Sequence, residues 1–220
     1  MKFEKQYVQP IGVAILRLLS YAAILYGISE LIYLDSLTET RTGKFGEHSF
    51  TEWTQEIFIL LCSIIYFTLS RYDRTITGFT GMLSGMALMA FIREFNNYFH
   101  TWFKGAWQMF VLIALILTII YVYHNRQSLV KPFYEYLKLP AFGVTMSGFV
   151  SLMVFSRLFG RGRMWRNILE VDDLGEGPYR WVKNAAEEGT ELLGYALILI
   201  GTLEYAWFIW DKKRRERTGR

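Results

Sequence analysis

Cysteine and histidine are scarce in this sequence, and their scarcity excludes several kinds of site. The 220 residues include one cysteine and three histidines. Cys62 alone cannot form a disulfide framework within the chain or a structural zinc site built from several cysteines. No His-x-x-x-His or His-Glu-x-x-His occurs, the spacing with which one helix holds a catalytic zinc. The chain also lacks the Gly-x-x-x-x-Gly-Lys-Ser/Thr loop that binds phosphates.

Apolar residues, by contrast, are abundant and occur in long blocks. The sequence is 52% hydrophobic and 17% aromatic. About six blocks approach the ~20 residues that span a bilayer, and none alternates like a membrane barrel. The sequence therefore predicts an all-α fold, a polytopic transmembrane helical bundle, as a single domain over residues 1–220. The predicted spans are 11–34, 52–70, 77–98, 107–123, 140–156 and 186–210, with an outer segment at 157–185 that includes an interfacial helix near 164–171.

The distribution of positive charge predicts the topology. The net charge is +4, but the basic residues lie at the ends of the predicted spans, so nucleic acid is not an expected partner. The first apolar block is too long for a signal peptide and is not followed by a small-residue cleavage site, which indicates an uncleaved span. A cytoplasmic N-terminus puts Lys2, Lys5 and the basic tail Lys212–Arg217 inside. We therefore predict a multi-pass protein of the cell membrane, N-in and C-in, surrounded by the lipid bilayer.

One stretch near the predicted outer surface, residues 90–100, combines side chains that are costly at membrane depth. Arg93 and Glu94 are adjacent, and Asn97 and His100 follow at helical spacing. In an N-in topology, the acidic residues that open the second and last spans fall at the same level. We therefore predict one polar layer in the outer half of the bundle. Its predicted binding residues are Glu56, Arg93, Glu94, Asn97, His100, Glu187, Glu188 and Glu191.

Two interpretations of this layer need no metal centre. In the first, Arg93 pairs with Glu94, with Glu56 or with a glutamate of the last span, and the network only holds the helices in register. In the second, several carboxylates around one arginine bind a cation, a proton or a polar ligand, for transport or sensing. The sequence requires no cofactor for this, a divalent cation being one possible ligand, and His100 would titrate close to the outer surface.

The third interpretation is a metal-assisted hydrolase that acts on a lipid or peptide at the outer leaflet. His100 and His48, with one or two glutamates, would hold zinc with an open position. Basic residues of the outer segment would bind a lipid head group. These residues are Arg157, Arg161, Arg163 and Arg166. The sequence does not decide whether the chain is an enzyme.

Small residues mark helix faces that allow close approach of a neighbour. Gly78, Gly81 and Gly85 lie on one side of the predicted span 77–98. Gly143, Ser147 and Ser151 form a stripe on the span 140–156. The glycine face and the basic tail are the surfaces where a membrane partner or a second copy of the chain would bind.

Three fragments, taken together, resemble a diffuse set of uncharacterised bacterial multi-pass membrane proteins. Thr51-Glu52-Trp53 opens one span, Arg93-Glu94 ends the next, and Glu187-Glu188-x-x-Glu191-Leu192 opens the last. Members of that set share a glutamate-tryptophan span start, a paired acid at a span end and a similar final opening. Here Arg93-Glu94-Phe95-Asn96 stands where a doubled acid and Ser-Trp-Gly-Gln are common. The resemblance implies a bacterial inner-membrane location and no particular activity.

Overall fold

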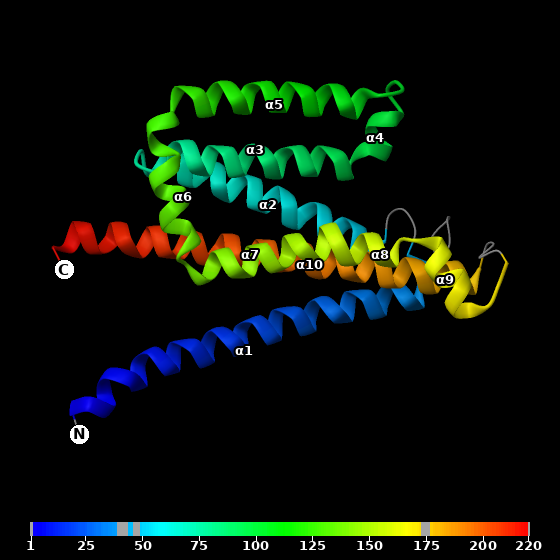
Figure 1. Cartoon of the computed structure of the whole chain (residues 1–220), viewed down its shortest axis with the longest axis horizontal. Helices are drawn as coiled ribbons and strands as arrows, with labels where there is room; N and C mark the ends of the chain where they lie inside the picture. Colours follow the sequence, from blue (N-terminus) through cyan, green and yellow to red (C-terminus); the bar gives the residue numbers. More distant parts are fainter. Residues whose placement is uncertain (1, 39–43, 46–48, 173–176, 220) are drawn as a thin grey trace.

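The chain folds into a bundle of helices (Figure 1). The computed structural model describes residues 2–38, 44–45, 49–172 and 177–219, and the side chains of residues 2–10, Asn97 and His100 lie outside this description. The structure is 87% helical and has no strand in the described ranges. The predicted all-α fold class is therefore confirmed.

Long helices alternate with short connecting helices along the chain. They are α1 (Lys2–Leu37), α2 (Phe50–Tyr72), α3 (Thr77–Glu94), α4 (Asn96–His100), α5 (Ala106–His124), η1 (Arg126–Ser128), α6 (Val130–Leu137), α7 (Pro140–Val150), η2 (Ser151–Ser156), α8 (Arg157–Phe159), α9 (Gly162–Leu169) and α10 (Pro178–Thr218). The short helix η1 is of the 3-10 type, whereas η2 is π-helical. Because α7, η2 and α8 follow one another without a gap, they form one continuous rod.

Five helices are long and apolar enough to cross a membrane. They cover Ile11–Leu37, Phe50–Tyr72, Ala106–His124, Pro140–Phe159 and Pro178–Thr218. The predicted span at 77–98 is not among them, because the helix ends at Glu94 and its glycines, serine and threonines make it less apolar. It packs between α2 and α5. The number of spans therefore stays a prediction.

Several boundaries differ from the sequence-based prediction, and two of these differences lie next to the charged residues. The helix expected over 77–98 breaks at Phe95 and resumes as α4. Much of the segment 157–185, expected as an outer connection, is helical, and α10 begins at Pro178 within it. Proline is favoured at the first helical position, where its missing N–H costs nothing. The expected interfacial helix near 164–171 corresponds to α9, which is strongly amphipathic.

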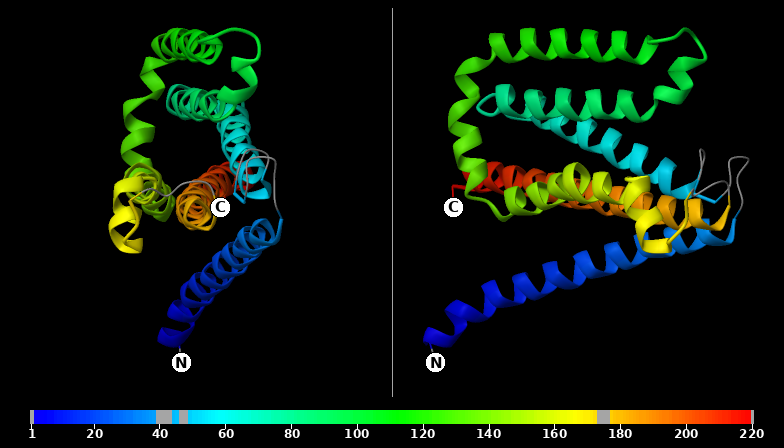
Figure 2. Two further views of the ribbon diagram at one scale, coloured as in Figure 1. Left: turned by 90° about the vertical axis from the view of Figure 1, so that its right-hand side faces the viewer. Right: turned by 45° about the vertical axis from the view of Figure 1, so that its right-hand side comes forward.

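Seen end-on, the helices form an open arc. The order around it is α5, α3, α2, α10 and α7, and α6 runs between α5 and α7 (Figure 2, left). α6 joins α5 to α7 across the end that carries both termini, which we call the termini end; the other is the far end (Figure 1). α1 lies outside the arc, in contact with α10 and α2.

An aromatic cluster holds α6 in place at the termini end. The rings of Phe79 and Tyr136 have centroids 5.4 Å apart, and those of Tyr136 and Tyr205 are 4.9 Å apart. The Tyr136 hydroxyl donates to Oγ1 of Thr145 at 2.9 Å. These contacts join α3, α6, α7 and α10, so α6 closes the arc at this end.

Glycines allow two close helix crossings. A Cβ at Gly78, Gly81 or Gly85 would collide with atoms of α5 or of the turn after it, which confirms that this face accepts a close neighbour. The second crossing joins α7 and α10, where a Cβ on Gly148 would lie 2.5 Å from the Gly194 carbonyl oxygen. Gly143 of the predicted stripe instead faces open space.

Asp73 ties the turn between α2 and α3 to the end of α10. Its Oδ1 accepts hydrogen bonds from the Thr75 N–H at 2.9 Å and from the Thr75 hydroxyl at 2.8 Å. Nζ of Lys213 lies 3.3 Å away, and the Asp73 side chain is only 4% exposed. Burial disfavours the charged carboxylate, but the bonds from Thr75 and Lys213 outweigh it and lower the pKa of Asp73.

We expect Asp73→Asn to lower the free energy of unfolding by about 1–3 kcal/mol at neutral pH, because a charged, hydrogen-bonded acceptor is lost. The pKa of Asp73 is lower in the folded chain than its value of ~3.9 in the unfolded chain, so the ionised carboxylate stabilises the fold above that pH. This contribution disappears as the pH falls through the pKa of the folded chain. Thermal midpoints in detergent across a pH series measure both effects. Wild type and variant should differ near neutrality and converge in acid. Glu216→Gln, which removes an exposed neighbour of Lys213, is the control; a gap independent of pH would contradict the assignment.

Candidate functional site

Acidic side chains from three helices meet towards the far end of the bundle. Glu56 of α2 is within electrostatic reach of Glu52 and of Glu94 at the end of α3. Glu94 in turn interacts with Glu191 of α10. We call this set, together with Glu187, Glu188 and the side chains that bind it, the carboxylate layer. Helices far apart in the sequence therefore bring their acids to one level.

Arg93, Glu94 and Tyr195 form the centre of the layer. The Arg93 guanidinium makes an ion pair with Oε1 of Glu94. The Tyr195 hydroxyl donates to the same oxygen at 2.6 Å and so ties the end of α3 to α10. Rings of Phe91, Phe95 and Tyr98 pack across the break between α3 and α4 with centroids 4.8 Å apart in each pair, the first pair tilted and the second stacked. Glu94 is therefore fixed by two elements and compensated by one cation.

Glu191 is held from the π-helical segment. The Ser156 hydroxyl donates to Oε1 of Glu191 at 2.6 Å, and Nη2 of Arg157 lies 3.8 Å from the same oxygen. Ser156 is the last residue of η2 and is fully buried. The end of η2 thus provides both a neutral donor and a cation for one carboxylate.

Two further acids of α10 also have partners. Nε2 of Gln55 donates to the Glu188 carboxylate at 3.1 Å and to the Glu188 carbonyl at 3.0 Å. Nζ of Lys183 lies 2.6 Å from Oε2 of Glu187, one helical turn away. These contacts join α2 to α10 and neutralise Glu187.

Glu56 differs from the other acids of the layer. Its residue is 3% exposed, and the described residues provide no hydrogen-bond donor to its carboxylate. The charged groups that act on it most strongly are the carboxylates of Glu52 and Glu94. Like charges so close to a buried carboxylate disfavour its ionised form, so the described neighbours of Glu56 favour a proton or a cation at this position.

The start of α2, which carries Glu56, is fixed by a cap from α1. The Asp35 carboxylate accepts hydrogen bonds from the N–H groups of Phe50 at 2.9 Å and Thr51 at 2.7 Å. The Ser49 hydroxyl accepts from the Glu52 N–H at 3.1 Å. Acceptors at a helix N-terminus satisfy N–H groups that have no partner within the helix. The first turn of α2 is therefore held both by Asp35 of α1 and by Ser49, the residue that precedes α2.

Some predicted site residues lie elsewhere or outside the description. The side chains of Asn97 and His100, and the whole of His48, fall outside the described residues. Within the described part, no three His, Cys, Asp or Glu side chains are close enough to hold a metal ion. The zinc hydrolase therefore stays a prediction.

The four arginines predicted to bind a lipid head group divide into two kinds. Arg157 turns towards Glu191 of the carboxylate layer. Arg161 and Arg163 are exposed at α9, and Arg166 is half-buried on the same helix. The predicted set therefore does not form one cluster around a single head group with Arg157, and its role stays a prediction.

Five participants were not among the predicted binding residues: Glu52, Gln55, Ser156, Lys183 and Tyr195. Each lies next to, or one turn from, a predicted charged residue at the end of a span. Their participation could therefore have been inferred from the sequence, because they lie at the same predicted depth as those charged residues. What the sequence did not reveal is which donor faces which carboxylate, because that depends on the rotation of each helix in the bundle.

Comparisons with protein-family models, with curated proteins and with solved structures find no match to the chain.

Proposed function

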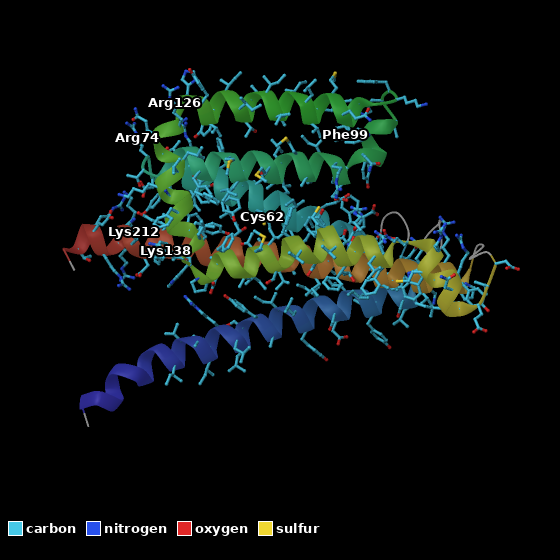
Figure 3. All side chains as sticks on the ribbon, viewed as in Figure 1. Cys62, Arg74, Phe99, Arg126, Lys138 and Lys212 are labelled. Carbon is cyan, nitrogen blue, oxygen red and sulfur yellow. The ribbon has the colours of Figure 1, made fainter. Side chains whose placement is uncertain are left out.

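We propose that the chain is an integral membrane protein of six spans, N-in and C-in, in a bacterial inner membrane. Support comes from the five apolar helices and from the shared position of the two termini (Figure 1). Arg74, Arg126, Lys138 and Lys212 gather at the same termini end (Figure 3). Positive residues favour the cytoplasmic side, so the far end with the carboxylate layer would be the outer one. α3 would be the sixth span, sheltered from lipid by α2 and α5.

In this proposal the carboxylate layer binds a cation, a proton or a polar ligand, for transport or sensing. Among the described side chains it joins the acids Glu52, Glu56, Glu94, Glu187, Glu188 and Glu191 to the cations Arg93, Arg157 and Lys183. Arg93 is the fixed counter-charge of Glu94. The excess of acids over bases favours a positively charged ligand.

The observation that carries the proposal is the buried residue Glu56, whose strongest charged neighbours in the described part of the chain are the carboxylates of Glu52 and Glu94. Groups that destabilise the fold where they stand are typical of functional sites.

We expect Glu56→Gln to raise the thermal midpoint, because a neutral amide removes charge repulsion in a buried position. The same change should abolish proton or cation flux in liposomes, or the stabilisation of detergent-purified protein by added cations. Glu30→Gln is the matched control, since Glu30 is exposed on α1.

Flux and cation-dependent stabilisation that survive Glu56→Gln would contradict the proposal. So would the absence of both effects in the wild-type protein, a result that would favour a structural or partner-binding subunit.

A further inference from the structure

A polar pocket of about 390 Å³ lies at the termini end, where α2 and α5 end and α3 begins (Figure 1). This volume falls within the ~300–1,000 Å³ typical of ligand sites. Each lining residue carries a polar or charged group, and Arg74 is labelled at this end in Figure 3. The lining residues are Ser70, Arg71, Arg74, Thr77, Tyr121 and Asn125.

Close packing of α3 against the end of α5 forms one wall of the pocket. The Gly78 N–H donates to Oγ of Ser128 at 2.8 Å, and a Cβ on Gly78 would collide with the Asn125 carbonyl oxygen. The Tyr121 hydroxyl lies 3.2 Å from Oγ of Ser70 and so joins α5 to α2. The shape of the pocket is therefore set by the packing of three helices.

The neutral polar side chains of the pocket already have protein partners. The Ser70 hydroxyl donates to the Phe67 carbonyl at 2.7 Å, and the Thr77 hydroxyl donates to the Ser70 carbonyl at 2.9 Å. Nδ2 of Asn125 donates to the Tyr121 carbonyl at 2.8 Å. Carbonyl groups at the ends of α2 and α5 therefore have donors without the help of the two arginines.

Arg71 and Arg74 differ from these groups, because their guanidiniums have no hydrogen-bond or ion-pair partner among the described residues. Both side chains are exposed. Asp73, which lies between them in the sequence, binds Thr75 and Lys213 instead. A guanidinium carries five N–H donors and stays protonated. The described part of the pocket therefore presents two positive charges without an acidic partner.

We propose that this pocket binds a phosphate group through the guanidiniums of Arg71 and Arg74. A phosphate has the charge and the several acceptor oxygens that suit two guanidinium forks, whereas a chloride ion would leave most of the donors unused. In the proposed topology the pocket lies at the cytoplasmic side, where basic pockets between membrane helices bind anionic head groups. The phosphate belongs either to a lipid head group or to a free phosphate compound. This site is separate from the carboxylate layer and would stand even if that layer were purely structural.

Two measurements on the full-length protein test the proposal and distinguish the sources of phosphate. Isothermal titration calorimetry in a nonionic detergent uses inorganic phosphate at constant ionic strength. Native mass spectrometry compares phosphatidylglycerol with phosphatidylcholine of identical chains. Binding in the calorimeter would assign a free phosphate compound, and selective retention of phosphatidylglycerol would assign a lipid head group. In either case, Arg71→Gln combined with Arg74→Gln should weaken the binding roughly tenfold.

Matched variants separate the pocket from the general positive charge of this end. Lys138→Gln combined with Arg214→Gln removes the same charge at exposed positions outside the pocket and should bind like wild type. Arg71→Lys combined with Arg74→Lys keeps the charge without the planar fork, so it should bind less tightly than wild type, and it replaces the glutamine variant if that does not fold. Wild-type binding by folded pocket variants, or an equal loss in the control, would overturn the proposal. So would a wild-type protein that binds neither probe.

Discussion

Gly148→Ala is expected to lower the free energy of unfolding by about 1–3 kcal/mol, the usual range for an overpacked contact. The new methyl group would lie 2.5 Å from the Gly194 carbonyl oxygen and 2.9 Å from the Ile198 backbone nitrogen. Backbone atoms cannot rotate away as a flexible side chain can. The α7 rod would therefore move off α10.

Gly143→Ala is the matched control, because it lies on the same helix and has nothing within 4 Å of its expected Cβ. Alanine is a better helix former than glycine, so this variant should be neutral or more stable by up to about 1 kcal/mol. Thermal midpoints in one detergent measure the pair. Equal values for the two variants would show that α7 and α10 do not cross at Gly148.

Arg93→Ala is expected to lower the free energy of unfolding by about 1–3 kcal/mol. Removing one partner of a fully buried ion pair costs ~3–5 kcal/mol, but the Arg93 side chain is 42% exposed and is partly screened. Glu94 would keep only the Tyr195 hydroxyl as a described donor. Arg93→Lys should recover part of the loss, since the charge returns without the planar guanidinium.

A double-mutant cycle identifies the cause. If the loss comes from an uncompensated Glu94, then Glu94→Gln combined with Arg93→Ala should recover most of it. Arg163→Ala, at an exposed arginine of α9, should leave the midpoint unchanged. A midpoint unaffected by Arg93→Ala would show that the Arg93–Glu94 ion pair does not stabilise the end of α3.

The sequence alone predicted the limits of several helices closely. It also predicted that acidic residues of different helices lie at one level of the bundle. Block length placed α2 and α5 within two residues of their observed limits. It also placed Glu56, Glu94 and Glu191 at one height, because depth follows from distance to a span end. These are properties that each helix carries by itself.

What depends on the packing of several helices could not be predicted in this way. Gly143 and Gly148 are both glycines of α7, but only the rotation of the rod decides that Gly148 meets α10. The break at Phe95 has no proline or glycine beside it in the sequence, and the rings of Phe91, Phe95 and Tyr98 pack across it. Likewise, Glu56 and Glu94 look alike in sequence, and only the fold gives Arg93 and Tyr195 to one of them.

The complete burial of Cys62 has a practical result. As the chain's single thiol, it is sealed from maleimide reagents, so a cysteine introduced elsewhere would label without background. Replacing Arg126 or Arg163 in this way would report which membrane face each occupies in intact cells, and the native chain would serve as its own blank.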